Sequence, residues 1–148
     1  MLSKAFIGYI DIRVFAHATE DADKVLTAVR NILSPEIMET VNFKKTNLTG
    51  HHGNPIVLLE ARIKDGKAAQ KVFENLALGL STLDKELLNS EITQHLDKGN
   101  LYIRIDKQSA YLNELKLSTE DPIHFRIHFK KHSQKEIIDI CKQFGLIP

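Results

Sequence analysis

The sequence predicts an α+β fold in which helices pack against one face of a mostly antiparallel sheet. Three features support this prediction. Several segments alternate strictly between aliphatic and polar residues, which is typical of strands with one covered face. Other segments repeat apolar residues at helical spacing. A run of four aliphatic residues, Ile56 to Leu59, follows a glycine-rich turn. With 148 residues the chain is long enough for one domain, which we expect to span residues 1–148.

The segment at residues 55–63 is the most apolar strand, and we expect it to lie at the centre of the sheet. Gly50 and Gly53 can adopt the positive φ angles of a sharp reversal, and Pro55 begins the strand where no ladder N–H is required. After the aliphatic run the strand alternates, so one of its faces becomes polar. Residues 39–46 also alternate, and we expect them to form a strand that pairs with it across the glycine turn.

The same two periodicities predict the remaining elements. Strands are expected at residues 8–18, 101–106 and 123–130, with a short strand at 115–117. Amphipathic helices are expected after Thr19, ending at Ser34-Pro35, and at residues 68–80, 107–113 and the C-terminal end. Further helical pieces are expected after Ser81 and Ser90. The expected helix caps are Thr19, Ser81, Ser90, Asp106 and Ser133.

Composition excludes several classes of protein. The net charge is +1, so any nucleic-acid binding must depend on where the charges lie. No apolar run approaches the roughly 20 residues of a transmembrane helix, and we expect no membrane partner. The single cysteine excludes an intramolecular disulfide and fits the reducing cytoplasm, which is the expected location.

Four of the five arginines lie in expected strands and out of phase with the aliphatic residues: Arg13, Arg62, Arg104 and Arg126. If the strands pair in one sheet, these arginines share one face. The same face would carry Tyr9, Phe15, His17, Tyr102, His124, His128 and Lys130. Arginine and aromatic side chains together suit bidentate contact with phosphate and stacking on bases. The pattern therefore indicates a candidate RNA-binding face.

Two other interpretations of this face fit the residues. Asp11, Glu60 and Asp106 have the same phase and could neutralise the arginines, so a salt-bridged structural face has near even odds with a binding face. The aromatic residues could equally form a second small core or a homodimer interface.

We expect no cofactor, no metal and no catalytic residue. The adjacent His51 and His52 would point to opposite sides of an extended chain, and no further ligand lies at metal-site spacing. Cys141 lies on an apolar helix face, which favours an inert buried thiol. The sequence contains no nucleophile elbow, Walker motif or zinc-protease helix.

Three blocks of the sequence resemble an archaeal RNA-binding family of predicted exosome subunits. The blocks are IRVFAHATE at residues 12–20, GHHGNPI at 50–56 and LYIRIDKQ at 101–108, and the similarity runs from about Asp11 to Phe129. The resemblance implies a fold like that of the ribosomal protein that binds 5S RNA, with a curved sheet backed by helices. It also implies RNA binding without catalysis, linked to RNA processing or degradation. The polar positions that match are Arg13, His17, His51, His52, Asn54, Arg62, Arg104, Lys107 and Gln108.

The main hypothesis is therefore a non-catalytic protein that binds single-stranded or structured RNA and contacts exosome or other RNA-processing proteins. Its predicted RNA-binding residues are Arg13, His17, Arg62, Tyr102, Arg104, Lys107, Arg126, His128 and Lys130, with His51, His52 and Asn54 in the turn. The alternative is a protein-interaction or dimerising structural subunit that does not touch nucleic acid. A hydrolase using His51 or His52 is the least favoured hypothesis.

Overall fold

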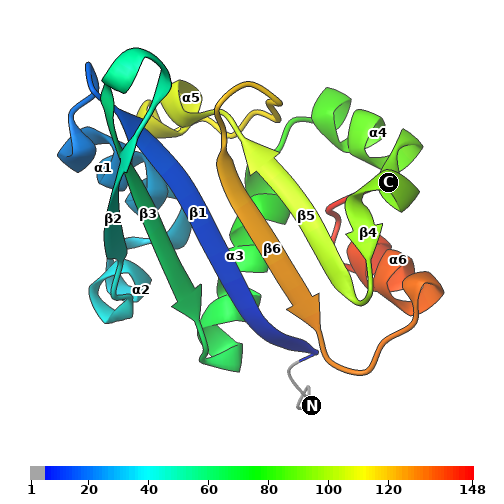
Figure 1. Cartoon of the computed structure of the whole chain (residues 1–148). Coiled ribbons are helices and arrows are strands. Elements are labelled where there is room, and N and C mark those ends of the chain that lie inside the picture. The colour runs from blue at the N-terminus through cyan, green and yellow to red at the C-terminus, as the bar shows by residue number, and fades with distance from the viewer. Residues whose placement is uncertain (1–5) are drawn as a thin grey trace.

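The computed structural model describes residues 6–148, which contain one open, antiparallel, six-stranded sheet (Figure 1). The strand order is β2-β3-β1-β6-β5-β4, and each neighbouring pair is antiparallel. The strands are β1 (Ile7–His17), β2 (Lys44–Thr49), β3 (Pro55–Ile63), β4 (Leu96–Asp97), β5 (Asn100–Ile105) and β6 (Ile123–Phe129). The predicted α+β class is confirmed.

The helices lie on one side of this sheet. In Figure 1 the helices α1, α3 and α6 lie behind the strands and leave the front face uncovered. The α-helices are α1 (Ala22–Leu33), α2 (Pro35–Thr40), α3 (Gly66–Gly79), α4 (Thr82–Ser90), α5 (Lys107–Tyr111) and α6 (Gln134–Gln143), and two 3-10 turns are η1 (His51–Gly53) and η2 (Ile92–His95). None of the helices in the described residues combines the length and apolar character that crossing a membrane requires.

The core lies between the sheet and the helices and follows the alternation of the strands. In β6 the residues Ile123, Phe125, Ile127 and Phe129 are all buried, while the residues between them face the open side. Phe73 of α3 packs edge-on against Phe129, with 5.8 Å between the ring centres. Large aliphatic and aromatic side chains of this kind supply most of the stabilisation of such a two-layer domain.

Three of the predicted caps are present at the helix N-termini. Ser81 accepts a hydrogen bond from the backbone N–H of Asp84, and Asp106 accepts one from Ser109. Ser133 forms a full capping box with Glu136 at the start of α6. Cys141 is buried on the inner side of that helix, and burial raises the pKa of its thiol to about 12. A thiol in that environment is unreactive.

The prediction that residues 55–63 form the central strand is wrong. β1 and β6 are the two middle strands, and β3 lies one strand from the edge formed by β2. The aliphatic run misled the prediction because its residues do not all enter the core. Ile56 and Leu58 point to the open face, where they are only partly covered, and Leu59 alone of the run is fully buried.

Several predicted boundaries also need correction. Residues 35–40 form α2, because Ser34 and Pro35 start a new helix as well as ending α1, so β2 begins only at Lys44. The cap of α1 is Asp21 instead of Thr19. The turn after α4 has no side-chain cap from Ser90. The predicted strand at 115–117 consists of two isolated bridges, from Leu115 to Leu80 and from Leu117 to Ile105.

The β2–β3 turn depends on backbone conformations that its sequence permits. Gly53 has a φ of 77° and His52 a φ of 60°, both in the left-handed region. A Cβ atom on Gly50 would lie 2.3 Å from the Ile56 side chain. Glycine is therefore favoured at position 53 by the backbone conformation and at position 50 by the close approach of Ile56. In Figure 1 the turn lies beside the end of β1.

Candidate nucleic-acid interface

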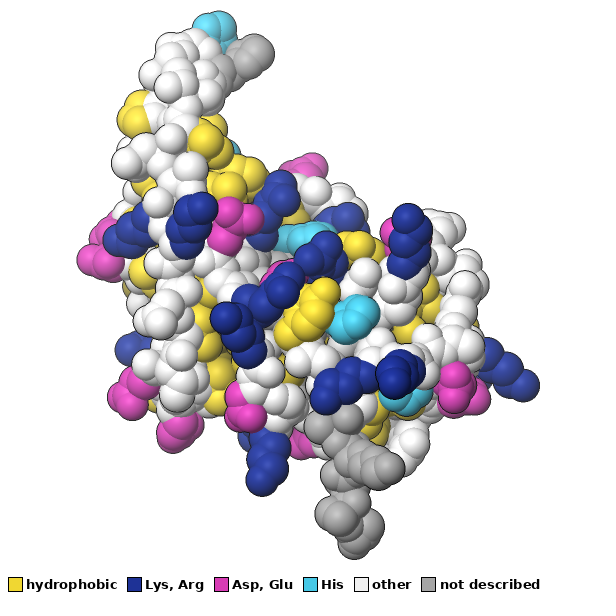
Figure 2. All heavy atoms as spheres, turned by 60° about the horizontal axis from the view of Figure 1, so that its bottom comes forward, with side chains coloured by type: hydrophobic (Ala, Val, Ile, Leu, Met, Phe, Trp, Pro, Cys, Tyr) yellow, Lys and Arg dark blue, Asp and Glu magenta, His cyan; other side chains and the backbone are white. Residues whose placement is uncertain are grey.

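The four strand arginines lie on the uncovered face of the sheet. Arg13 is on β1, Arg62 on β3, Arg104 on β5 and Arg126 on β6, each at an outward position of its strand. Figure 2, a view turned by 60° from that of Figure 1, shows Lys and Arg side chains gathered around His and apolar side chains in the middle of the molecule. The arrangement that the alternation predicts is present.

Strand register arranges these side chains in rows that cross the sheet. Lys44, Glu60, Arg13, His124 and Arg104 are successive cross-strand neighbours from β2 to β5, and we call them the basic row. Three of its five members are permanently cationic, and they alternate with Glu60 and His124. Neighbouring strands lie about 4.8 Å apart, so successive cations of the row are roughly 10 Å apart at the backbone.

The adjacent row contains a carboxylate held by two arginines. Asp11 accepts hydrogen bonds from Arg62 at 2.7 and 3.0 Å and from Arg126 at 2.5 Å. Partial burial would raise the pKa of Asp11, but the hydrogen bonds from both arginines outweigh burial and hold it below its ordinary value. The hydrogen bonds to Asp11 raise the pKa of both guanidinium groups. Arg62 and Arg126 are therefore partly neutralised.

Arg13 and Arg104 differ from that pair because neither forms an ion pair within residues 6–148. They flank His124, which lies between them in the register. Burial, followed by the charges of Arg104, Arg13 and Arg126, lowers the pKa of His124. The imidazole is thus neutral near pH 7, and the surrounding positive charge is available to an anion.

A hollow of about 620 Å³ opens over these two rows. The residues that line it come from β1, β3, β5, β6, the start of β2 and the segment just before β2: Asp11, Ile12, Arg13, Asn42, Lys44, Glu60, Ala61, Arg62, Tyr102, His124 and Arg126. It is an open, polar depression that suits a charged polymer lying across the surface better than an enclosed small molecule.

The aromatic residues of the face fall into two groups. Tyr9 has the Arg62 guanidinium 4.0 Å from its ring centre and the His128 ring stacked at 4.7 Å. His128 is fixed in turn by Asn100, at 2.9 Å from its Nδ1. Tyr102 lies at 5.6 Å from the ring of His124. These rings are part of the network that holds the arginines in place.

The second group forms an apolar zone on the other side of the basic row. It consists of Leu48 on β2, Ile56 and Leu58 on β3, and Phe15 on β1. In the register, Leu58 lies opposite Phe15, and Ile56 lies between Leu48 and His17. None of the four is among the described residues that build the main core or pack against it. The open face therefore has a cationic part and an apolar part side by side.

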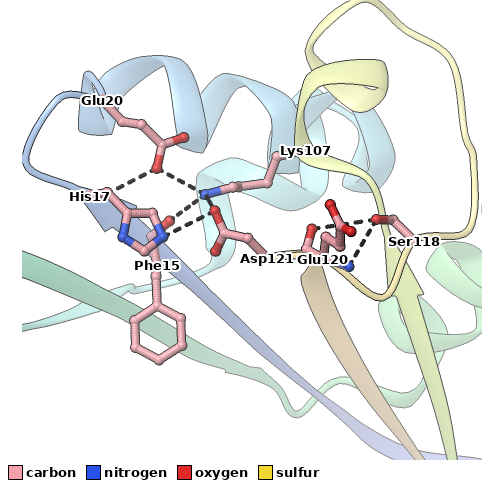
Figure 3. A network of polar contacts seen from close by, with 7 residues as sticks. All are labelled: Phe15, His17, Glu20, Lys107, Ser118, Glu120 and Asp121. Atoms are coloured by element: carbon pink, nitrogen blue, oxygen red, sulfur yellow. Dashed lines mark hydrogen bonds and ion pairs between the residues drawn. The ribbon is translucent and has the colours of Figure 1, made fainter. Parts of the chain in front are cut away.

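Lys107, a predicted RNA-binding residue, is placed differently from that prediction. It is 7 % exposed, and its Nζ contacts the Phe15 carbonyl at 2.9 Å, Glu20 at 3.0 Å and Asp121 at 2.6 Å (Figure 3). An ammonium group surrounded by these oxygens is not available to phosphate. Its two carboxylates come from the loop after β1 and the loop before β6, so Lys107 joins distant segments.

His17 belongs to the same network. Its Nε2 lies 3.0 Å from Asp121, and its backbone N–H donates to Glu20. His17, Glu20 and Asp121 are close enough to hold a metal ion, but the Lys107 ammonium contacts both carboxylates. A divalent cation would have to displace that ammonium. The geometry thus gives His17 a structural contact, and with 42% of its side chain exposed its predicted RNA contact stays a prediction.

The other predicted site residues lie at the edges of the face. Lys130 is exposed just after β6, and Asn54 and His52 are exposed in the β2–β3 turn. The side chain of His51 lies outside the described residues. Asp106, which we expected beside the arginines, instead caps α5.

Two residues of the site, Lys44 and His124, were not among the predicted RNA-binding residues, although alternation places His124 on the open face. Asp11 was one of three carboxylates expected to be able to neutralise the arginines, and only the strand order shows that it pairs with Arg62 and Arg126. Strand order depends on long-range pairing, which no local pattern encodes.

Comparison with known proteins assigns the chain to a protein family. Residues 9–129 match the model of a protein family described as RNA binding. The chain belongs to this RNA-binding family. It is 42% identical over 139 residues to the RNA-binding protein PAB1135 of Pyrococcus abyssi, covering 92% of this chain and 90% of that protein. The predicted resemblance to an archaeal RNA-binding family is confirmed to that extent.

Solved structures of archaeal proteins share the fold of this RNA-binding family member. Protein AF2318 of Archaeoglobus fulgidus has a TM-score of 0.76 at 27% identity and covers 93% of this chain and 99% of its own. Protein SSO0741 of Sulfolobus solfataricus has a TM-score of 0.74 at 30% identity and covers 92% and 96%. The architecture described above is therefore that of a group of natural proteins with nearly the same length.

Proposed function

We propose that this protein binds RNA through the open face of its sheet and does not catalyse a reaction on it. The observation that carries the proposal is the pair Arg13 and Arg104, which lie on either side of His124 and face outward. Neither guanidinium group has a carboxylate partner among residues 6–148. Family membership and the name of the Pyrococcus abyssi relative agree with RNA as the ligand. Phosphate oxygens would replace the missing carboxylates.

Single-stranded or irregular RNA fits this face better than a regular duplex. The face is crossed by aromatic and aliphatic side chains as well as by cations, and bases reach such side chains only when they are unpaired. A duplex would present mainly phosphates and 2′-hydroxyls, leaving the apolar zone without a partner.

The absence of catalysis is part of the proposal and rests on the chemistry of the groups present. Asp11, the carboxylate nearest the centre of the face, is held ionised by two arginines and is poorly suited to accept or donate a proton. Incubating labelled RNA with the protein and Mg²⁺, Mn²⁺ or Zn²⁺ tests this part. Cleavage of the RNA by the wild type that the Arg13→Gln/Arg104→Gln variant does not perform would contradict the absence of catalysis.

Titration of a fluorescent single-stranded RNA at several salt concentrations tests binding. We expect the double variant Arg13→Gln/Arg104→Gln to lose at least about tenfold in affinity at low salt. The slope of log K against log[salt] should become shallower by about 1.4, since each phosphate contact on a single strand contributes about 0.7. Arg30→Gln removes one positive charge of the same kind from an exposed position on α1, away from the sheet face, and should change neither quantity.

The proposal is wrong if the wild-type protein binds no RNA at low salt, or if the double variant and Arg30→Gln behave alike. Both variants replace exposed side chains, so their thermal unfolding should match that of the wild type.

We also propose, on the family resemblance, that the protein acts cytoplasmically with RNA-processing or RNA-degrading proteins such as exosome subunits. The resemblance to a 5S-RNA-binding ribosomal protein belongs to the same proposal. Co-purification with the exosome before and after nuclease treatment tests the link. Association that survives removal of RNA supports direct contact, and no association in either case contradicts the link.

A second function, docking of a protein partner or a second copy, is favoured by one observation. β2 is an edge strand with an exposed Leu48, and edge strands can pair with another chain. Lys44 and Lys45 on the same strand oppose such pairing. Light scattering discriminates: a stable dimer that covers the basic row and excludes RNA would replace RNA binding as the function of this face.

A further inference from the structure

The proposed RNA-binding function leaves open how a strand would lie on the face and which side chains its bases would meet. We infer, resting on that function, that a single strand crosses the sheet with its phosphates over the basic row and its bases on the apolar zone. In this arrangement Phe15 is the stacking platform, with Leu58 beside it. Tyr9 and Tyr102 are not the platform.

The direction of the strand follows from the basic row. Lys44, Arg13 and Arg104 lie on alternate strands, so their cations run perpendicular to the strands. A phosphate chain that followed a single β-strand would meet Arg13 and then Asp11, which is clamped by its two arginines, or Phe15. The path across the sheet passes Glu60 once but brings the phosphates to three cations, Lys44, Arg13 and Arg104, none of which forms an ion pair within residues 6–148.

The side on which the bases lie follows from the rows that flank the basic row. On one side lies the Asp11 clamp, with ionised groups already paired. On the other side lies the apolar zone, whose Phe15 is two residues from Arg13 on β1, or about 7 Å along the strand. Bases placed on the clamp would bury paired charges, whereas bases placed on Phe15 and Leu58 cover apolar surface.

Tyr9 cannot offer a free ring face. Arg62 from β3 covers it at 4.0 Å, and His128 from β6 stacks against it at 4.7 Å. Tyr102 lies beside His124. The pKa of Arg126 is raised first by its hydrogen bond to Asp11, and a hydrogen bond with Tyr102 also contributes.

Phe15 has looser neighbours. The carbon at the centre of the Arg13 guanidinium lies 5.9 Å from its ring centre, and the His17 ring centre lies at 6.4 Å. At these distances a base could lie against the ring while Arg13 reaches the phosphate of the same nucleotide. The pair Arg13 and Phe15 would thus bind one nucleotide at both of its ends.

The experiment compares two probes of equal length by fluorescence anisotropy: oligouridine, and an oligonucleotide in which the same ribose-phosphate chain carries no bases. The wild-type protein should bind oligouridine about tenfold or more tightly than the abasic strand, because base–aromatic stacking supplies the difference. Phe15→Ala should abolish this preference and leave the salt slope unchanged. Arg13→Gln should keep the preference and make the slope shallower by about 0.7.

Tyr9→Leu is the matched control, since it removes an aromatic ring from the same strand and face. It should retain the preference for oligouridine. The inference is overturned if Phe15→Ala still prefers oligouridine as strongly as the wild type, or if Tyr9→Leu alone loses the preference.

The outcomes separate this inference from the function on which it rests. Equal binding of both probes by the wild type overturns the stacking platform but leaves RNA binding in place. Binding of neither probe overturns both. A wild-type dimer that Phe15→Ala dissociates would show that a second copy covers the apolar zone, which also overturns the inference. Circular dichroism melts confirm that each variant is folded, and Phe15 lies outside the core, so its replacement should not unfold the protein.

Discussion

Replacing Lys107 with methionine tests whether this residue stabilises the fold instead of binding RNA. Methionine keeps an unbranched, flexible side chain of similar length but removes the ammonium group. Three oxygen atoms then lose their partner: the Phe15 carbonyl, a Glu20 carboxylate oxygen and an Asp121 carboxylate oxygen. The two carboxylates would also repel each other across the vacated position.

The expected loss follows from the burial of these groups. A hydrogen bond to a charged group is worth about 1.5–3 kcal/mol when buried. Glu20 and Asp121 keep 32% and 40% of their side-chain surface exposed, so solvent screens both ion pairs and reduces their contribution. We therefore expect a loss of about 2 kcal/mol in the free energy of unfolding. For a domain of this size that corresponds to a decrease in Tm of roughly 6 °C.

Chemical denaturation and thermal melts measure this loss, and Lys116→Met provides the control. The Lys116 ammonium lies 3.6 Å from Glu114, with side-chain exposures of 61% and 63%, so its removal should have little effect. The folded Lys107→Met protein should bind RNA with wild-type affinity and salt slope. A stability no lower than that of Lys116→Met, or a shallower salt slope, would refute this assignment of Lys107.

Two further predictions concern the clamp and its neighbour. Asp11→Asn should strengthen RNA binding and steepen its salt dependence, because it releases Arg62 and Arg126. It should cost about 1 kcal/mol of stability near pH 7. That difference should begin to shrink as the pH falls below about 3.9 and vanish only below the lowered pKa of Asp11 in the folded state. Weaker RNA binding by Asp11→Asn would contradict the clamp. The lowered pKa of His124 means that the unfolded chain binds its proton more readily, so the contribution of His124 to stability is complete above about pH 6.5 and declines below it. In the His124→Gln variant the denaturation midpoint should change less between pH 7 and pH 5 than in the wild type. An unchanged pH dependence of the midpoint would exclude this role.

Local periodicity predicted the faces of the strands but not their order. In β1 and β6 the alternation correctly separates core residues from the open face. The same rule failed to locate β3, because its aliphatic residues serve two surfaces. Ile56 and Leu58 form part of the apolar zone, and a sequence run cannot distinguish apolar residues that enter a core from those that remain on an open face.

Lys107 illustrates a different limit of prediction from sequence. Its charge and its position beside a strand that carries Arg104 suggest a phosphate ligand, and the family resemblance supports that suggestion. Its burial depends on Glu20 and on the Phe15 carbonyl, which lie 87 and 92 residues away in the chain. The family resemblance thus pointed to Lys107 correctly as a notable position, but in the structure Lys107 joins the end of β1 to the start of β6.

The sequence left two interpretations of the arginine face equally open, and the structure shows why both are partly correct. Asp11 lies in register with Arg62 on one side and Arg126 on the other, so a single carboxylate occupies two of the four arginines. Glu60 lies in register with Arg13 but forms no ion pair with any residue of the described chain. The face therefore contains a fixed half and a free half. A clamp that orients neighbouring side chains, while Arg13 and Arg104 have no ion-pair partner in the part of the chain that the structure describes, is the arrangement expected of a surface whose anionic partner comes from another molecule.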